Sequence, residues 1–250
     1  MIKRFNRFEL KYIVPAATRD ALLDELRAHV SPDLEGGPTG VYAITSLYYD
    51  SPDLACLRAK EDGIRFRRKL RIRRYGELGS VPAPVMVEIK QRIGRTTQKR
   101  RVAVRLDDAY RLCRGGGELE WSDPADAAVA AEVEFLAHAL LLRPTCVIGY
   151  TRQAFMGSRY EPGLRITFDQ SLWSSIPDDG VSGAAPRHEI LPPNLLVLEV
   201  KVNNAVPLWI SHLLARHHCG LSRYSKYCAG LRRLMALGVW SHAAGGISDG

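Results

Sequence analysis

Apolar and polar residues alternate with a period of two over much of this chain, which is the pattern of half-buried β-strands. We expect strands at residues 3–13, 41–50, 64–74, 85–92, 99–106, 146–155, 163–169 and 195–202. Apolar residues at helical spacing predict helices at residues 15–30, 124–142, 207–218 and 225–237. Strands that outnumber helices in this way favour a mostly antiparallel α+β sheet, with the helices packed at its rim and outside.

Segments rich in Gly, Pro, Ser and Asp separate these elements. They are predicted to be loops and lie at residues 31–40, 76–84 and 171–194. None of them divides the chain into two self-sufficient halves, so we expect a single domain over residues 1–237. The last residues, 238–250, are predicted to form a flexible C-terminal tail.

Basic residues occupy one face of the strand expected at 64–74. Alternate residues along this strand are cations that share one face. They are Arg65, Arg67, Lys69, Arg71 and Arg73, which we call the basic stripe. Phe66, Leu70 and Ile72 point to the opposite face. Cations spaced at about 6.6–7 Å repel one another, and an ordinary solvated sheet face does not need them. The basic stripe therefore indicates an anionic partner.

A second pattern places an acid and a base two residues apart on one face of a strand, with apolar residues on the other. It occurs as Glu9 with Lys11, Glu88 with Lys90, and Glu199 with Lys201. One such strand is most simply a solvent-exposed face with a weak surface ion pair. Three of them together with the basic stripe favour a shared charged interior instead, such as a closed barrel of about eight strands. Cations outnumber carboxylates there, which predicts a polyanionic, phosphate-rich ligand.

The composition is that of a globular domain with a basic surplus. Hydrophobic residues make up 46% and charged residues 25% of the 250 residues, with a net charge of +8 and a pI near 9.4. The five cysteines show no paired spacing, so we expect no disulfide framework and a reducing, cytoplasmic location. No uncharged run approaches the roughly 20 residues of a membrane helix, and the N-terminus lacks the apolar core of a signal peptide.

Nine blocks of the sequence follow the order of a known family. They are RFELKY (7–12), SLYYD (46–50), RKLRIRRY (68–75), VEIK (87–90), the basic strand at 99–105, GYTRQAF (149–155), LRITFD (164–169), LEVK (198–201) and RYSKY (223–227). On these blocks the chain resembles the VTC-type polyphosphate polymerase domain, within the triphosphate tunnel (CYTH-like) metalloenzyme superfamily. The resemblance implies an antiparallel eight-stranded β-tunnel, which agrees with the number of expected strands.

The resemblance also implies which residues bind phosphate and metal. Phosphate contacts are expected from Lys11, Arg71, Arg73, Lys90, Lys99, Arg152, Arg165 and Lys226, with hydrogen bonds from Tyr150 and Ser225. Glu199 is expected to be the main ligand of Mn²⁺ or Mg²⁺, whereas Glu88 and Glu9 are better explained as salt-bridge partners inside the tunnel. Lys226, Arg152 and Arg165 are the candidates for catalysis, because they would stabilise charge on a transferred phosphoryl group.

Simpler roles compete with some of these assignments. A packing role for Tyr150 and a helix-cap role for Ser225 explain these two residues equally well. Lys226, by contrast, would begin the helix expected at 225–237, where a cation is unfavourable unless an anion binds. Arg7 departs from the hydrolases of the superfamily, many of which carry an acid at this position. Fewer acids mean fewer metal ligands for activating water, which favours the VTC branch.

The leading hypothesis is a metal-dependent polyphosphate polymerase that transfers the γ-phosphate of ATP to a growing polyphosphate chain. The alternatives are a tripolyphosphate or short-chain hydrolase, and a non-catalytic module that binds polyphosphate or inositol polyphosphates. Nucleic-acid binding is not expected, because only 8% of the residues are aromatic and none forms a clear base-stacking platform. Fungal relatives belong to membrane assemblies, so recruitment of this chain to a membrane would need a separate partner subunit.

Overall fold

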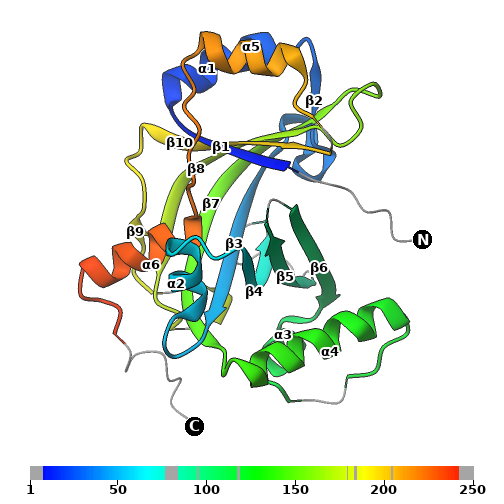
Figure 1. The fold of residues 1–250 in the computed structure, drawn as a ribbon, viewed down its shortest axis with the longest axis vertical. Coiled ribbons are helices and arrows are strands. Elements are labelled where there is room, and N and C mark those ends of the chain that lie inside the picture. Colours follow the sequence, from blue (N-terminus) through cyan, green and yellow to red (C-terminus); the bar gives the residue numbers. More distant parts are fainter. Residues whose placement is uncertain are drawn as a thin grey trace. The chain divides into compact units, whose positions relative to one another are not determined.

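The computed structural model describes residues 8–76, 84–94, 96–116, 119–178, 180–182, 185–203 and 205–241 (Figure 1). The strands are β1 (Phe8–Pro15), β2 (Val30–Pro32), β3 (Val41–Asp50), β4 (Phe66–Tyr75), β5 (Val85–Ile93), β6 (Thr96–Val104), β7 (Arg143–Gly157), β8 (Arg165–Ser175), β9 (His188–Glu189) and β10 (Leu195–Val202). The α-helices are α1 (Ala16–Leu26), α2 (Ala55–Glu61), α3 (Leu106–Cys113), α4 (Pro124–Ala139), α5 (Leu208–Arg216) and α6 (Lys226–Ala236). Two short 3₁₀ helices are η1 (Leu34–Thr39) and η2 (Gly180–Ser182).

Eight strands form the main path of the sheet, in the order β1-β10-β8-β7-β3-β4-β5-β6. The short strands β2 and β9 pair with β7 and β8 beside this path. The mostly antiparallel α+β class is therefore confirmed. In the part of the chain that the structure describes, the path begins at β1 and ends at β6 rather than returning on itself, and the closed tunnel stays a prediction.

The chain divides into two compact units. The first contains Met1–Ala43, Tyr150–Leu172 and Leu191–Ser225, and the second contains Ile44–Gly149, Trp173–Ile190 and Lys226–Gly250. Strands β3, β7 and β8 contribute residues to both units. We describe each unit by itself, and the single domain expected over residues 1–237 stays a prediction.

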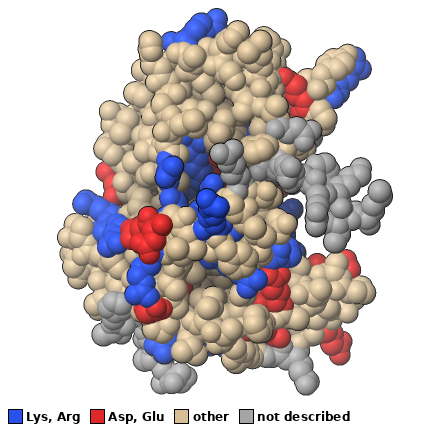
Figure 2. All heavy atoms as spheres, in the orientation of Figure 1, with Lys and Arg blue, Asp and Glu red and all other residues tan. Residues whose placement is uncertain are grey.

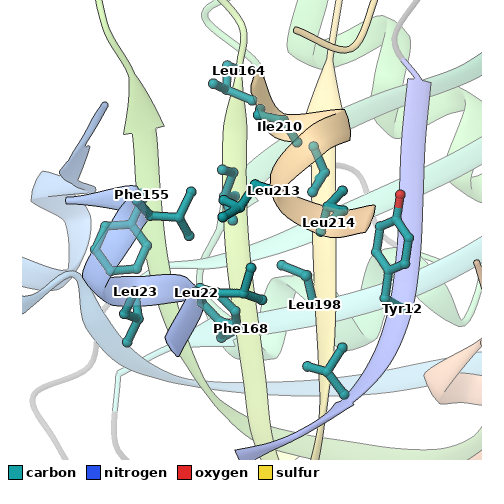
Figure 3. Packing of buried hydrophobic residues seen from close by; sticks show 14 of the residues in the cluster. Tyr12, Leu22, Leu23, Phe155, Leu164, Phe168, Leu198, Ile210, Leu213 and Leu214 are labelled. Carbon is teal, nitrogen blue, oxygen red and sulfur yellow. The ribbon is translucent and has the colours of Figure 1, made fainter. Parts of the chain in front are cut away.

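In the first unit, the apolar faces of β1, β10 and β8 pack against α1 and α5. The strands supply Tyr12, Leu198 and Phe168, and the helices supply Leu22, Leu23, Ile210, Leu213 and Leu214 (Figure 3). Residues directly before and after each of these strand positions point to the other face, because the side-chain period of a strand is two. The helices thus cover one face of these strands, and the charged residues of the E-x-K pattern lie on the other.

The second unit repeats this division with different helices. Leu70 and Ile72 of β4, Val87 and Ile89 of β5, and Val102 of β6 are almost completely buried in one cluster. Helices α3 and α4 cover this cluster with Leu112, Val133 and Leu136. The alternating faces predicted for the basic stripe are therefore confirmed, except that Phe66 at the start of β4 is 49% exposed.

Several local predictions were wrong. Strand β8 runs on to Ser175, so the loop expected at 171–194 begins later than predicted. Ser171 has a positive φ of 53°, which interrupts the regular alternation from which the end of the strand was predicted. The α-helices α2 and α3 were not predicted, and α3 begins directly after Arg105, which had been placed in a strand. Both helices are short, and short helices leave a weak periodic signal.

Other predictions fall partly outside the described residues. Most of the loop expected at 76–84 and the end of the expected tail, residues 242–250, lie there, as does Arg7. Within the expected tail, the indole N–H of Trp240 donates to the Thr145 carbonyl at 2.9 Å.

Substitution of a buried residue of β4 tests this packing. Ile72→Ala removes a side chain with no exposed surface, and we expect it to lower the free energy of unfolding by about 2–5 kcal/mol. Phe66→Ala on the same strand is the control, with an expected loss below about 1 kcal/mol because Phe66 is half exposed. Urea denaturation measures both. Equal losses for the two variants would contradict the buried face.

Candidate functional site

The charged face of the first unit is built by cross-strand pairing of β1, β10 and β8. Lys11 pairs with Glu199, and Glu199 pairs in turn with Thr167. In the next row Glu9 pairs with Lys201, which pairs with Arg165. Directly opposite residues of an antiparallel pair share one face, so the two acids and the three bases of these rows lie on one face of the three strands.

Glu199 is the centre of an ion-pair network. Its two oxygens lie 3.2 Å from the Lys11 Nζ and 3.2 Å from the Lys201 Nζ, and 3.6 Å from an Arg152 nitrogen. The Lys11 Nζ also lies 3.1 Å from Glu9. Burial by itself would lower the pKa of Lys11, but Glu199 and Glu9 outweigh burial and raise it, so Lys11 stays charged. Because its side chain is only 5% exposed, Glu199 is held among these cations with little access to water.

Arg152 of β7 forms the second ion pair of this face. Its Nε and Nη2 donate to the two oxygens of Asp169 at 2.6 and 2.7 Å, in a bidentate geometry. Both side chains are buried, and the Arg152 guanidinium lies 5.4 Å from the ring centre of Tyr150. Burial would lower the pKa of Arg152, but Asp169, Tyr150 and Glu199 raise it well above its ordinary value. Arg152 is therefore a fixed cation.

Arg165 of β8 is oriented by two residues from the N-terminal segment of the first unit. Its Nη2 donates to Asp33 at 2.6 Å and to the Tyr42 hydroxyl at 2.7 Å. Asp33 lies directly before η1, and its carboxylate also accepts from the Glu35 backbone N–H. These contacts hold the outer end of the Arg165 guanidinium in place.

The charged face of the second unit has a strong surplus of cations. Glu88 is the only acidic residue in β4, β5 and β6. The register places Lys69 opposite Lys90 and Lys90 opposite Lys99, so three lysines stand side by side in one row. Like charges directly opposite each other destabilise a sheet. Figure 2 shows Lys and Arg atoms gathered around the position of these strands.

Glu88 is completely enclosed by cations. Arg71 donates from Nε and Nη2 to one of its oxygens at 2.8 and 2.6 Å, and Lys99 donates to the other at 3.1 Å. Burial would raise the pKa of Glu88, but Arg71, Arg73 and Lys99 lower it far below its ordinary value. Arg73, which is also buried, donates to the Ser46 hydroxyl at 3.1 Å. Glu88 therefore acts as a fixed counterion within this cluster.

Tyr48 lies in the same row as Arg71 and Glu88. Its hydroxyl accepts a hydrogen bond from Arg71 at 2.9 Å, and only 7% of the residue is exposed. Burial opposes ionisation of a phenol, but Arg71, Arg73 and Lys69 outweigh it and lower the pKa of Tyr48 to about 8. This unusually acidic tyrosine reports the strength of the positive potential in the second unit.

Lys226 is the first residue of α6 and is only 7% exposed. The next residue, Tyr227, donates its hydroxyl to Asp50 at the end of β3. Asp50 also accepts from the backbone N–H groups of Ser51, Cys56 and Leu57, and thereby joins β3, α2 and α6. The first turn of α6 contains no acid, so a buried cation stands at the positive end of a helix, as predicted.

The structure distributes the predicted site residues over two clusters. The first unit holds Lys11, Arg152, Arg165, Glu199, Glu9, Tyr150 and Ser225, and the second holds Arg71, Arg73, Lys90, Lys99, Glu88 and Lys226. Tyr150 is buried beside Arg152, and Ser225 is the residue directly before α6. Their roles in phosphate binding stay predictions.

The carboxylates differ in how well they suit a divalent cation. Glu9 and Glu199 both contact the Lys11 ammonium, so their oxygens lie near one point. Mg²⁺ is commonly held by one or two carboxylates together with the phosphates of a substrate, and this pair fits that requirement. The two oxygens of Glu88 are occupied by Arg71 and Lys99. Within the described ranges, no group of three or more His, Cys, Asp or Glu residues could hold a metal ion.

Several residues of the two clusters were not predicted as site residues. Asp169 and Lys201 stood in the alternating strands, but the sequence did not reveal that they contact Arg152 and Glu199. Tyr48 and Asp50 belong to the block SLYYD, whose alternation showed only that a strand was present. Cross-strand register, which the local pattern does not contain, decides all of these contacts.

Comparison with known families identifies the chain. Residues 6–235 match the family described as VTC domain, which is most of the 250 residues. The chain belongs to the VTC domain family. No curated protein matches the sequence. No helix in the described residues combines the length and apolar character needed to cross a membrane.

Solved structures resemble the chain only distantly. A candidate adenylate cyclase of Bacillus halodurans is 12% identical, with a TM-score of 0.48 over 88% of this chain and 95% of that one. The PH1819 protein of Pyrococcus horikoshii OT3 is 12% identical, with a TM-score of 0.44 over 93% and 99%. A candidate adenylate cyclase of Vibrio parahaemolyticus is 11% identical, with a TM-score of 0.43 over 89% and 97%. Similarities of this size assign no activity to the VTC domain described here.

The acidity of Tyr48 can be measured directly. We expect absorbance at the phenolate wavelength to show one tyrosine that ionises near pH 8, and this step to be absent in Tyr48→Phe. Because the native pKa lies below the ordinary value of about 10, ionisation favours the folded state as pH rises from about 8 to 10. Tyr160→Phe, which changes an exposed tyrosine, is the control and should keep the step. A Tyr48→Phe titration identical to wild type would contradict the cationic environment.

Proposed function

We propose that this VTC domain is a metal-dependent polyphosphate polymerase, which transfers the γ-phosphate of ATP to a growing polyphosphate chain. Membership of the VTC domain family supports the proposal, and so does the sequence resemblance to polyphosphate polymerases. The observation that carries it is the row Lys69–Lys90–Lys99, with Glu88 as the only acid in its three strands.

The repulsion within this row argues for a ligand with repeated negative charges. Opposite side chains of neighbouring strands have Cβ atoms about 4.5–5.5 Å apart, so the three lysines concentrate positive charge in one row. The Lys69 Nζ lies 4.5 Å from the centre of the Tyr227 ring, and the Lys99 Nζ contacts Glu88. Glu88 already serves Arg71 and Lys99 and cannot neutralise the row. A chain of phosphates brings about one charge per residue and would neutralise several cations at once. Lysine and arginine are both suited to bind phosphate oxygens.

Each cluster has a role in this proposal. In the second unit, Arg71, Arg73, Lys90 and Lys99 bind phosphates of the chain or nucleotide, and Lys226 stabilises charge on the transferred phosphoryl group. In the first unit, Lys11, Arg152 and Arg165 bind and orient phosphates. Tyr150 and Ser225 add hydrogen bonds. No nucleophile from the protein is required, because catalysis of phosphoryl transfer consists mainly of positioning and electrostatic stabilisation.

The metal ion, Mn²⁺ or Mg²⁺, would be held by Glu199 with help from Glu9. When bound, it neutralises charge between neighbouring phosphates. Lys11 and Lys201 now pair with Glu199, and both side chains are partly exposed, so they can turn toward phosphate oxygens. Carboxylate oxygens would thereby be released at the same time as phosphate is bound.

ATP and polyphosphate are the proposed partners, and nucleic acid is not. A cytoplasmic location is proposed, in which recruitment to a membrane would depend on a separate subunit. This part of the proposal rests on the free thiols of the chain and on the absence of a membrane-spanning helix among the described residues.

Incubation of the purified chain with ATP and Mn²⁺ tests the activity. We expect release of ADP and formation of an acid-labile phosphate polymer. Glu199→Gln and Lys226→Ala should each lower the rate by about 100-fold or more, as expected for loss of a group that stabilises the transition state. The matched controls are Glu35→Ala and Arg233→Ala, which change exposed residues, the second on α6 itself, and should keep the wild-type rate.

The products separate the alternatives. Release of orthophosphate from tripolyphosphate without chain growth would indicate a hydrolase. Binding of polyphosphate that survives Glu199→Gln, with no turnover of either substrate, would indicate a non-catalytic binding module. Either result would contradict the polymerase proposal.

The lysine row makes a separate prediction about affinity. Lys90→Met removes the central charge of the row, and we expect tripolyphosphate to bind about 2–5-fold more weakly at low salt, because each ion contact open to water contributes roughly 1 kcal/mol or less. The difference should shrink as salt is added. Arg111→Met, which changes an exposed residue of α3 with its own partner Asp108, is the control. Titration calorimetry at two salt concentrations measures the effect, and an unchanged affinity would contradict the role of the row.

A further inference from the structure

The hydroxyl of Thr167 has no hydrogen-bond partner in the part of the chain that the structure describes. Thr167 lies in the middle of β8 and is completely buried. A buried hydroxyl that makes no hydrogen bond costs roughly 1–3 kcal/mol, so such groups are rare unless a ligand, ion or water meets them.

The neighbours of Thr167 are the charged residues of the first unit. Glu199 is its direct cross-strand partner. Arg165 and Asp169 lie two residues before and after it on the same strand, and their side chains therefore point to the same face. The unpaired hydroxyl thus stands in the centre of the charged face and not in the apolar core on the other side of β8.

A second unpaired group lies beside it. The Nε of Arg165 is buried and has no hydrogen-bond partner among the described residues, while Nη2 of the same side chain is held by Asp33 and Tyr42. Residues two apart on a strand have Cα atoms about 6.6–7 Å apart, so one small ligand can reach both side chains.

The chemistry of this pair identifies the ligand class. The Nε of arginine can only donate a hydrogen bond, and it stays charged at every pH that a folded protein tolerates. A ligand shared by both groups must therefore accept hydrogen bonds and carry negative charge. A phosphoryl oxygen meets both conditions, whereas a metal ion meets neither.

We infer that Thr167 is a phosphate-binding residue, which donates its hydroxyl to a phosphoryl group that also accepts from the Arg165 Nε. The pair itself calls for an anionic hydrogen-bond acceptor, and the choice of phosphate among such anions rests on the proposed function. The inference adds a residue that neither the E-x-K pattern nor the family resemblance indicated. Asp33 and Tyr42 act as positioning residues, because they hold the Arg165 guanidinium from its other end.

The chain offers a matched control for a hydroxyl that is merely buried. Ser175, at the end of the same strand, is also buried, and its hydroxyl oxygen has no hydrogen-bond partner among the described residues. It belongs to the second unit and pairs with none of the residues around Thr167. A general effect of losing a buried hydroxyl should therefore appear equally in Thr167 and Ser175 variants.

The experiment measures binding of tripolyphosphate by titration calorimetry in the presence of EDTA, with the full chain. Thr167→Val keeps the shape of the side chain and removes the hydroxyl, and we expect affinity to fall by about 10-fold or more, the usual effect of losing one hydrogen bond to a charged group. Thr167→Ser keeps the hydroxyl and should bind within about threefold of wild type, as should Ser175→Ala. A parallel titration with a non-hydrolysable ATP analogue shows whether this group binds the nucleotide or only the chain.

Thermal unfolding without ligand completes the test. Thr167→Val should melt at the wild-type temperature or above it, because it removes an unpaired polar group from the interior. A lower melting temperature would mean that the hydroxyl has a structural partner, and equal affinities of Thr167→Val and wild type would mean that it meets no phosphate. Either result overturns the inference. If phosphate binding depends on the Thr167 hydroxyl but no polymer forms, the inference about Thr167 stands and only the polymerase proposal is rejected.

Discussion

Six strands have one apolar face and one charged face, and the candidate site depends on that division. They are β1, β8 and β10 in the first unit and β4, β5 and β6 in the second. Helices α1 and α5 cover the apolar face in the first unit, and α3 and α4 cover it in the second. The opposite faces then carry ionised groups with little access to water, where an uncompensated charge would be very costly. Glu199 and Glu88 are tolerated there because each is surrounded by cations. The charged faces are therefore a consequence of the packing and also the location of the candidate site residues.

The two units compensate their charges differently. In the first, Glu9, Glu199 and Asp169 alternate with Lys11, Lys201 and Arg152, so nearly every ion has a partner within the protein. In the proposed function, an incoming phosphate would have to compete there with carboxylates, which would favour ligands that bring a metal ion or displace a lysine. In strands β4, β5 and β6 of the second unit, Glu88 is the only acid, and the neighbouring cations Arg71, Arg73 and Lys69 lower the pKa of Tyr48. If the proposed function holds, attraction of an anion would depend mainly on the second unit and its placement mainly on the first.

Alternation along the chain predicted most of the sheet, and with it the faces on which the site residues lie. Strands β3 and β10 have the predicted ends because turn-forming Gly, Pro, Ser, Asn and Asp residues flank both of them. The pattern did not predict the helices α2 and α3, because helices of seven and eight residues leave little periodic signal. It also did not predict the end of β8, because the positive φ of Ser171 interrupts the alternation. Contacts such as Tyr227 with Asp50, 177 residues apart, are decided by tertiary packing and cannot be read from a local pattern. The resemblance supplied Lys226, but only the structure showed that its neighbour fixes the start of α6.

The lysine row across β4, β5 and β6 also bears on how long the protein persists in a cell. Like charges in opposite positions destabilise a sheet, so a phosphate chain bound as proposed would shift the folding equilibrium toward the native state by mass action. Chains without ligand spend more time in open states, which are the states that proteases attack. The amount of protein would then rise and fall with the supply of oligophosphate. A sheet with too many lysines would thus couple abundance to substrate without any dedicated sensor.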